Sequence, residues 1–193
     1  MNNFALKVFK YRSYSPIPFL VLMLLFQQAT PVSLVIGFTV ALLGEFFRFW
    51  GVAYAVSETR RTGEVGATYL VISGAFAHLR NPLYLGNMLM YLGIGIMSYA
   101  LFPYLQIVAL AFFMWQYYVI IKEEEGFLVQ KYGKAYEDYR AAVPKLIPSL
   151  TAYPNIGIEQ PPFNPKAGLK SEMRTLQAFA FIILIVIVRY ALS

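Results

Sequence analysis

Long apolar runs dominate this sequence and limit what it can fold into. A helix needs about 20 consecutive, mostly apolar residues to cross the hydrocarbon core of a bilayer. Five apolar segments can be marked, the first of them short, at residues 16–29, 32–56, 82–101, 103–121 and 176–192. Only 13% of the residues are charged, whereas 59% are hydrophobic. We therefore predict an all-α fold, a polytopic membrane helical bundle with about five transmembrane helices.

Short turns between the apolar segments predict which helices pair. The turn "QQATP" separates the first two segments and "ALFP" separates the third and fourth, so each pair is expected to form a helical hairpin. No internal repeat or soluble domain is visible. We predict a single membrane domain over residues 1–193, with a motif-bearing core at about 40–150 and an additional loop and span at 151–193.

The basic residues predict the orientation of the bundle. Arg48 and Arg189 lie within apolar segments, and the other Lys and Arg residues all fall on one side of the predicted bundle. These residues are Lys7, Lys10, Arg12, Arg60, Arg61, Arg80, Lys122, Lys131, Lys134, Arg140, Lys145, Lys166, Lys170 and Arg174. The positive-inside rule places the amino terminus and all long loops in the cytoplasm, at the inner membrane if the cell is bacterial. Because orientation accounts for the basicity, we predict no nucleic-acid partner.

The cysteine and histidine counts exclude several kinds of site. The chain has no cysteine, which excludes disulfides, thiolate zinc sites and cysteine nucleophiles. Its single histidine argues against a histidine metal site or a Ser-His-Asp triad. We therefore predict no metal.

The long polar stretch after the fourth segment is expected to contain one helix and one loop. Tyr132, Tyr136, Tyr139 and Val143 recur at a helical spacing, which predicts a cytoplasmic amphipathic helix lying on the bundle. The Pro-, Asn- and Gly-rich stretch "YPNIGIEQPPFNPKAG" that follows predicts a loop.

The stretch "AHLRNPLYLGN" carries polar residues where the chain enters its third apolar segment. Asn81 and Pro82 are typical of an N-cap and a first helical turn. On a structural interpretation, Arg80 reaches the membrane interface and Tyr84 belongs to an interfacial aromatic belt. On a functional interpretation, the free backbone N–H groups and the positive dipole end of the helix attract a carboxylate, with Arg80 adding donors.

The run "KEEE" closes the fourth apolar segment. Carboxylates at a helix C-terminus oppose the helix dipole, so Glu123, Glu124 and Glu125 are unfavourable there if the helix stops. If the helix continues, they form a solvated acidic turn that Lys122 partly neutralises. Alternatively they meet a cationic ligand. An anion site at one helix start and acidic residues at the end of the next would together suit a zwitterion such as an amino-acid-like cofactor.

Glu45 and Arg48 are ionisable residues inside the second apolar segment. Their i, i+3 spacing places them on one helix face, where they could pair. Glu45 lies 15 residues before Arg60, about 22 Å along a helix. At that depth its side chain does not easily extend to the membrane interface. Intramembrane ionisable residues often mark functional sites. The two interpretations are a structural ion pair and a polar site for a substrate head group that enters from the lipid.

Two stretches together resemble the isoprenylcysteine carboxyl methyltransferase family and its phospholipid methyltransferase relatives. They are "GAFAHLRNPLYLGN" (74–87) and "EEGFLVQKYGKAYEDYRAAVPKLIP" (124–148), within a likeness that extends over about 40–150. The matching residues are Arg80, Asn81, Pro82, Tyr84, Gly86, Glu124, Glu125, Gly133, Tyr136, Tyr139, Val143 and Pro144. One departure is Asn81, which stands where many members have histidine.

The resemblance implies an integral-membrane methyltransferase that uses S-adenosylmethionine. Its acceptor would be lipophilic, a prenyl-type carboxylate or a phospholipid amine, and would arrive from among the membrane lipids. By position, the predicted cofactor-binding residues are His78, Leu79, Arg80, Asn81, Pro82, Tyr84, Glu124 and Glu125. The predicted catalytic residues are Glu45, as a base for an amine acceptor, and Arg48, which would orient the acceptor's head group.

Two other functions are weighed against this one. A membrane reductase of the sterol type would bind NADPH, whose phosphates call for a basic pocket that the acidic run at 123–125 does not favour. A non-catalytic membrane scaffold would explain the aromatic helices but leaves Glu45, Arg48 and the acidic run without a purpose.

Overall fold

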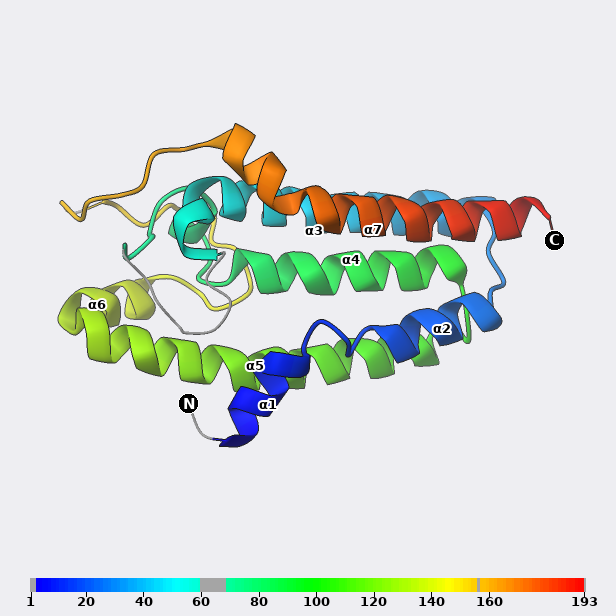
Figure 1. Cartoon of the computed structure of the whole chain (residues 1–193), viewed down its shortest axis with the longest axis horizontal. Helices are drawn as coiled ribbons and strands as arrows, with labels where there is room; N and C mark the ends of the chain where they lie inside the picture. The colour runs from blue at the N-terminus through cyan, green and yellow to red at the C-terminus, as the bar shows by residue number, and fades with distance from the viewer. Residues whose placement is uncertain (1–2, 60–68, 156, 193) are drawn as a thin grey trace. The chain divides into compact units, whose positions relative to one another are not determined.

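The computed structural model describes residues 3–59, 69–155 and 157–192, and in them all regular structure is helical (Figure 1). Arg60 and Arg61 lie outside the described residues. The elements are α1 (Asn3–Tyr11), α2 (Ile17–Leu25), α3 (Pro31–Thr59), the short 3-10 helix η1 (Gly74–Ala77), α4 (Pro82–Ser98), α5 (Tyr104–Tyr132), α6 (Lys134–Ala142) and α7 (Pro165–Ala191). The predicted all-α class is confirmed.

Three of these helices are long and apolar enough to cross a membrane. They are α3 over Pro31–Ala55, α5 and α7. The helix α4 has 17 residues, the lower limit of the ~17–25 that a span requires, and α2 has 9. Three candidate spans are therefore found among the described residues, and the predicted count of five is not confirmed.

The last helix begins earlier than its apolar segment suggested. It starts at Pro165, whereas the apolar segment starts at Leu176. The Asn164 side chain caps it, because the N–H of Ala167 donates to Asn164 Oδ1 at 2.9 Å. Pro165 suits the first helical position, where no N–H is needed. The polar residues of the first turns hid this start from a hydropathy pattern, and the end of the predicted loop is helical.

The acidic run lies within a continuous helix. Because α5 extends to Tyr132, Glu123–Glu125 are two turns inside its end and do not oppose the dipole at a terminus. The chain reverses at Gly133, whose φ of 54° lies in the region that glycine adopts most readily. In Figure 1, α6 then folds back beside the last turns of α5.

The predicted amphipathic helix is confirmed as α6. Its residues Tyr136 and Tyr139 are buried, as is Val143 just after it, while Glu137 and Asp138 on the opposite face are exposed. The buried residues form a small core with Leu70 and Ile72 and with partly buried residues of α5.

The chain forms two compact units, and α3, α4, α5 and α7 contribute residues to both. Unit 1 comprises Met1–Glu45, Gly86–Ile120 and Arg174–Ser193. Unit 2 comprises Phe46–Leu85 and Ile121–Met173. The site described below belongs to unit 2. The single membrane domain of the sequence analysis stays a prediction.

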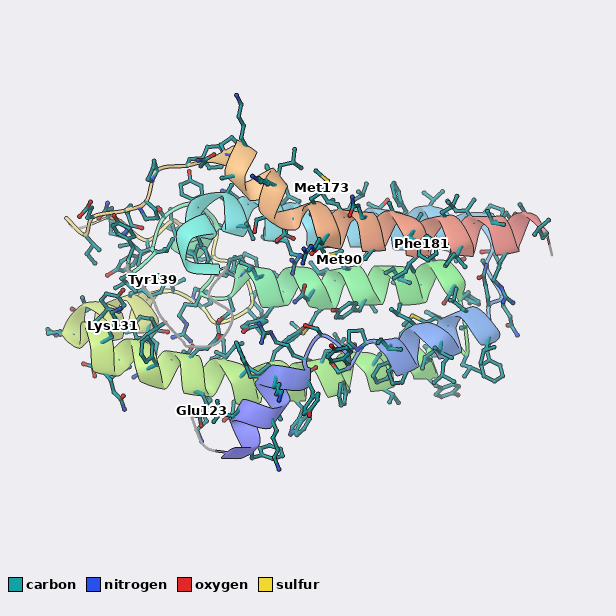
Figure 2. The ribbon with its side chains drawn as sticks, in the orientation of Figure 1. Met90, Glu123, Lys131, Tyr139, Met173 and Phe181 are labelled. Carbon is teal, nitrogen blue, oxygen red and sulfur yellow. The ribbon has the colours of Figure 1, made fainter. Side chains whose placement is uncertain are left out.

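Unit 1 is held together by close helix contacts. The helices α3 and α4 meet at Gly37 and Gly93, where a Cβ added to Gly93 would lie 2.5 Å from Gly37 O. The α4–α5 hairpin is confirmed, since Gln106 Nε2 donates to Gly95 O at 2.8 Å. The side chain of Met90 is part of the core of this unit (Figure 2).

The second predicted hairpin, between α2 and α3, has no such direct support. Phe19 of α2 packs its ring against Phe112 and Phe113 of α5, with both pairs of ring centroids 5.4 Å apart. Pairing of α2 with α3 stays a prediction.

Large apolar side chains on the outside of unit 1 fit a lipid environment. An apolar surface of this extent is rare on soluble monomers and typical of a membrane-facing surface. The exposed residues include Val32, Val35, Ile36, Ile107, Val108, Phe181 and Leu184.

Gly93→Ala should weaken the packing of α3 on α4. A methyl group there meets two backbone atoms of α3, Gly37 O and Ala41 N, so we expect a loss of about 1–3 kcal/mol from overpacking. Gly126→Ala is the matched control, because a Cβ at Gly126 meets nothing within 4 Å and alanine favours a helix by up to about 1 kcal/mol. Thermal unfolding in detergent, followed by circular dichroism, measures both. Equal midpoints for the two variants would contradict the close approach of the helices.

Candidate functional site

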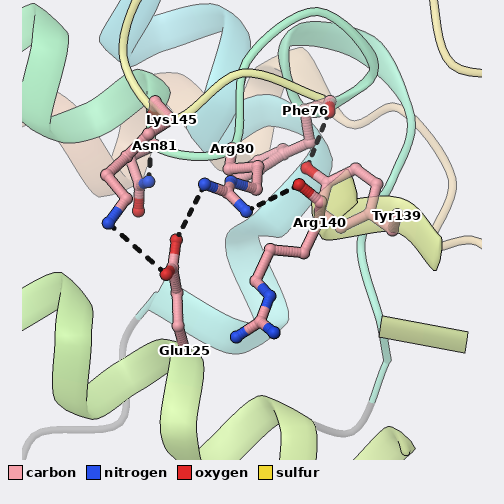
Figure 3. A network of polar contacts seen from close by, with 7 residues as sticks. All are labelled: Phe76, Arg80, Asn81, Glu125, Tyr139, Arg140 and Lys145. Carbon is pink, nitrogen blue, oxygen red and sulfur yellow. Dashed lines mark hydrogen bonds and ion pairs between the residues drawn. The ribbon is translucent and has the colours of Figure 1, made fainter. Parts of the chain in front are cut away.

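The two predicted motifs meet in unit 2 (Figure 3). Arg80, just before α4, lies with its Nη2 3.4 Å from Glu125 Oε1 on α5. Tyr84, in the first turn of α4, donates from its hydroxyl to Glu124 Oε1 at 2.8 Å. The residues that precede and begin one helix therefore contact the acidic run of the next.

Residues at the end of α6 and after it hold Arg80 and Asn81, the two residues that precede α4. The backbone N–H of Arg80 donates to Pro144 O at 2.9 Å, and its Nη1 donates to Arg140 O at 2.9 Å. The Asn81 side chain donates to Lys145 O at 3.0 Å. These bonds hold the guanidinium of Arg80 in one orientation, and Figure 3 shows it directed at Glu125.

Glu125 lies between two cations. Its Oε2 is 3.5 Å from Lys145 Nζ, and its Oε1 faces Arg80. Its side chain is only 12% exposed, so both contacts act with little screening by water. Lys145 was not among the predicted site residues. A signal was present, because Lys145 directly follows the Val-Pro pair of the motif.

Hydrogen-bonding capacity remains in this buried cluster. Among the described residues, Arg80 Nε and Glu125 Oε1 are buried and make no hydrogen bond. Buried polar atoms normally have such a partner. The two ion-pair distances of Glu125 also exceed the ~2.7–2.9 Å of a direct charge-assisted bond. A guanidinium donor and a carboxylate acceptor are thus both present, as a ligand with a carboxylate and an ammonium group requires.

The tyrosines of α6 brace the loop that carries Arg80. Tyr139 donates from its hydroxyl to Phe76 O at 2.8 Å, and its ring packs 5.9 Å from that of Tyr136. Burial, and then the negative charge of Glu125, raise the pKa of Tyr136 well above its usual range. Burial, and then Tyr136, do the same for the pKa of Tyr139. Both phenols therefore stay protonated, and Tyr139 remains a donor.

His78, Leu79 and Pro82 lie within two residues of Arg80 in the sequence. His78 Nδ1 is 2.8 Å from Ser149 O, and its ring lies 5.6 Å from that of Trp50. Leu79 is fully buried, and Pro82 is buried at the start of α4. The predicted cofactor contacts of these three residues stay predictions.

The predicted catalytic residues fall in different units. Glu45 is buried in unit 1. Arg48 belongs to unit 2, where Nε and Nη2 donate to Glu172 Oε2 of α7 at 3.0 and 2.5 Å. Sequence reasoning missed Glu172, because the apolar segment used to place the last helix begins after it. The roles of Glu45 and Arg48 stay predictions.

A comparison with known families decides the classification. The model of the phospholipid methyltransferase family matches residues 32–135, which include Arg80, Tyr84, Glu124 and Glu125. The chain belongs to the phospholipid methyltransferase family. This membership confirms the resemblance seen in the sequence. With the three candidate spans, it also indicates an integral membrane protein.

One curated relative is similar to part of the chain. It is the cobalt-zinc-cadmium resistance protein CzcN of Cupriavidus metallidurans, 30% identical over 124 residues, which are 64% of this chain and 53% of that protein. The chain thus spans about half the length of this relative. No solved structure matches the chain. Within the residues that the structure describes, no group of three or more His, Cys, Asp or Glu could hold a metal ion.

Because the phenol of Tyr139 is buried, the free energy of unfolding should fall as the pH rises into the alkaline range. The folded protein holds the phenolic proton more tightly than the unfolded chain, whose tyrosine pKa is about 10. Above that pH only the unfolded state loses this proton, so the free energy of unfolding should fall by about 1.4 kcal/mol per pH unit. In Tyr139→Phe this part of the slope should vanish, leaving a loss of about 1 kcal/mol at neutral pH from the missing hydrogen bond. Denaturant unfolding in detergent between about pH 8 and 12 tests this, and equal slopes would contradict it.

Proposed function

We propose that this chain is an integral-membrane methyltransferase that uses S-adenosylmethionine and methylates a lipophilic acceptor arriving from the bilayer. Membership of the phospholipid methyltransferase family supports the reaction class. The single observation that carries the choice of donor is the buried Arg80–Glu125 ion pair, in which Arg80 Nε and Glu125 Oε1 make no hydrogen bond. An amino-acid moiety has the complementary pair of charges.

Different residues of the cluster would bind the two charged groups of such a ligand. Arg80 and the backbone N–H groups at the start of α4 would hold its carboxylate, because both the guanidinium and a helix N-terminus favour an anion. Glu124 and Glu125 would hold its ammonium group. Tyr84 donates to Glu124 and so orients that carboxylate, while Lys145 limits the negative charge on Glu125.

Methyl transfer depends mainly on how the methyl donor and the acceptor are positioned relative to each other. Bound S-adenosylmethionine supplies a methyl carbon that accepts the acceptor's lone pair while the carbon–sulfur bond breaks and its electrons pass to sulfur. The buried cluster of this chain would fix one partner and exclude water, which together account for much of the acceleration. An amine acceptor must also lose a proton, and Glu45 or an acidic residue of α5 is the proposed base.

We also propose that the amino terminus and the long loops face the cytoplasm. The distribution of Lys and Arg along the sequence supports this orientation. The cofactor site would then open to the compartment that contains S-adenosylmethionine.

Variants of the cluster test cofactor binding. Arg80→Gln and Glu125→Gln should each weaken the binding of S-adenosylhomocysteine at least about tenfold, because each removes one charge-assisted contact. Glu137→Gln, on the exposed face of α6, is the matched control and should bind normally. Isothermal titration of monodisperse protein in detergent measures the affinities. Binding of NADPH but not of S-adenosylhomocysteine by the wild type would instead favour the reductase.

The acceptor can be found without assuming its identity. The purified protein is incubated with S-adenosylmethionine labelled in its methyl group and with a total lipid extract. We expect the label to enter a lipid, which mass spectrometry then identifies, and Arg80→Gln should abolish this transfer. Label that stays entirely in the aqueous phase would contradict a lipophilic acceptor.

A further inference from the structure

The first helix of unit 1 carries positive charges and no negative charge. Lys7 and Lys10 lie in α1, and Arg12 follows the helix directly. No Asp or Glu precedes Glu45, the first acidic residue of the chain. The basic residues of this part of the chain therefore have no acidic neighbours in sequence to neutralise them.

The two sides of α1 differ in what they contact. Ala5 is buried, and Val8 and Phe9, which are three and four residues later on the same side, are partly buried. Lys7 and Lys10 are three residues apart on the opposite side and are exposed. Both lysines thus point away from the helices on which α1 packs.

Arg12 has a local structural role. Its Nη1 donates to Phe9 O at 2.8 Å, and its guanidinium lies 3.6 Å from the centre of the Phe9 ring. An arginine that bonds to one of the last carbonyls of a helix stabilises the end of that helix. The charges that α1 presents to its surroundings are therefore those of Lys7 and Lys10.

Apolar side chains lie on both sides of these lysines. Phe4 and Tyr11 are one turn before and one turn after Lys7, and Leu6 is one turn before Lys10. All three are exposed. A small anion or an acidic protein surface would leave them in water, whereas the acyl chains of a lipid would cover them. Basic and apolar side chains together on one short helix are typical of a helix that lies in the membrane interface.

Contacts within unit 1 hold α1 against the apolar part of α5. The rings of Phe4 and Trp115 are 6.3 Å apart, and the Ser15 hydroxyl is hydrogen-bonded to the Gln116 side chain at 2.9 Å. Trp115 and Tyr118 are exposed on α5, as aromatic residues at a membrane interface commonly are. Figure 1 shows α1 inclined to α5 rather than parallel to it. With nine residues, α1 is only about 14 Å long and is too short to span a bilayer.

We propose that α1 is an interfacial helix whose Lys7 and Lys10 bind the head groups of anionic phospholipids beside α5. The lysines would contact the phosphates, while Phe4 and Leu6 would lie among the acyl chains. A cytoplasmic amino terminus, as proposed above, would place α1 at the leaflet whose anionic lipids make its surface negative. The inference is independent of the proposed methyl transfer, because α1 precedes the family-matching region and contains no residue of the cofactor cluster.

Trp115, whose ring contacts Phe4, can report lipid binding beside α1 without any cofactor. The chain has two tryptophans, so Trp50→Phe leaves Trp115 as the only one. Brominated phosphatidylglycerol or brominated phosphatidylcholine is titrated into this protein in maltoside micelles, and the quenching of fluorescence is followed. The anionic lipid should reach half-maximal quenching at about a tenfold lower mole fraction, because each lysine near the surface favours an anionic lipid.

Charge variants test whether α1 causes this preference. Lys7→Gln/Lys10→Gln should remove most of it, whereas Lys7→Arg/Lys10→Arg should keep it. The matched control is Lys166→Gln/Lys170→Gln, which removes the same charge from exposed positions of α7 and should also keep it. All of these side chains are exposed, so the variants should fold normally, which circular dichroism checks. An unchanged preference in the first variant, or an equal loss in the control, would overturn the proposal.

Salt and inorganic phosphate distinguish a lipid surface from a site for a small anion. Raising the sodium chloride concentration from about 0.05 to about 0.5 M should reduce the preference severalfold, because salt screens exposed charges. Sodium phosphate at equal ionic strength should reduce it no further, because free phosphate cannot cover Phe4 and Leu6. A markedly larger loss in phosphate than in chloride would overturn the assignment to lipid.

Discussion

The contact between Arg80 and Glu125 is the constraint on which the rest of unit 2 depends. It joins the approach to α4 to the far end of α5, two places 45 residues apart in the sequence. A buried charge is strongly destabilising if it loses its partner, so neither residue can move independently. The backbone bonds from Pro144 and Arg140, the cation of Lys145 and the brace from Tyr139 all serve to hold this one contact. Among the described residues, Arg80 Nε is left buried without a hydrogen-bond partner.

The length of α5 explains how a membrane helix can take part in such a polar site. Its first turns are apolar, and the helix continues without a break through the acidic run to Tyr132. Backbone bonds inside a helix are satisfied whatever surrounds it, so a single element can pass from lipid to a polar environment. The reversal at Gly133 and the buried face of α6 then return the chain to the same place. One long helix and one turn thus bring Glu125 and Lys145 together.

The sequence predicted the parts of this structure that depend on local pattern. Apolar segments indicated the long helices, and the tyrosine spacing predicted α6. What failed depended on long-range contacts or on length. Hydropathy also marked α4 and α2, whose 17 and 9 residues leave the predicted count of five spans unconfirmed. The start of α7 was hidden because its capped first turns are polar, and with it the partner of Arg48 was missed. No local pattern links residue 48 to residue 172.

The two buried ion pairs of unit 2, Arg80–Glu125 and Arg48–Glu172, differ in how closely their charged atoms approach each other. Arg80 and Glu125 lie in a loosely paired cluster, with distances above 3.3 Å and unsatisfied atoms, as in a site that exchanges internal contacts for a ligand. Arg48 and Glu172 are tightly paired within apolar helices, where an exchange must replace both charges together. Loose pairing allows a ligand to bind by adding contacts, whereas a tight pair must first be broken. The first arrangement suits a cofactor bound and released in every turnover.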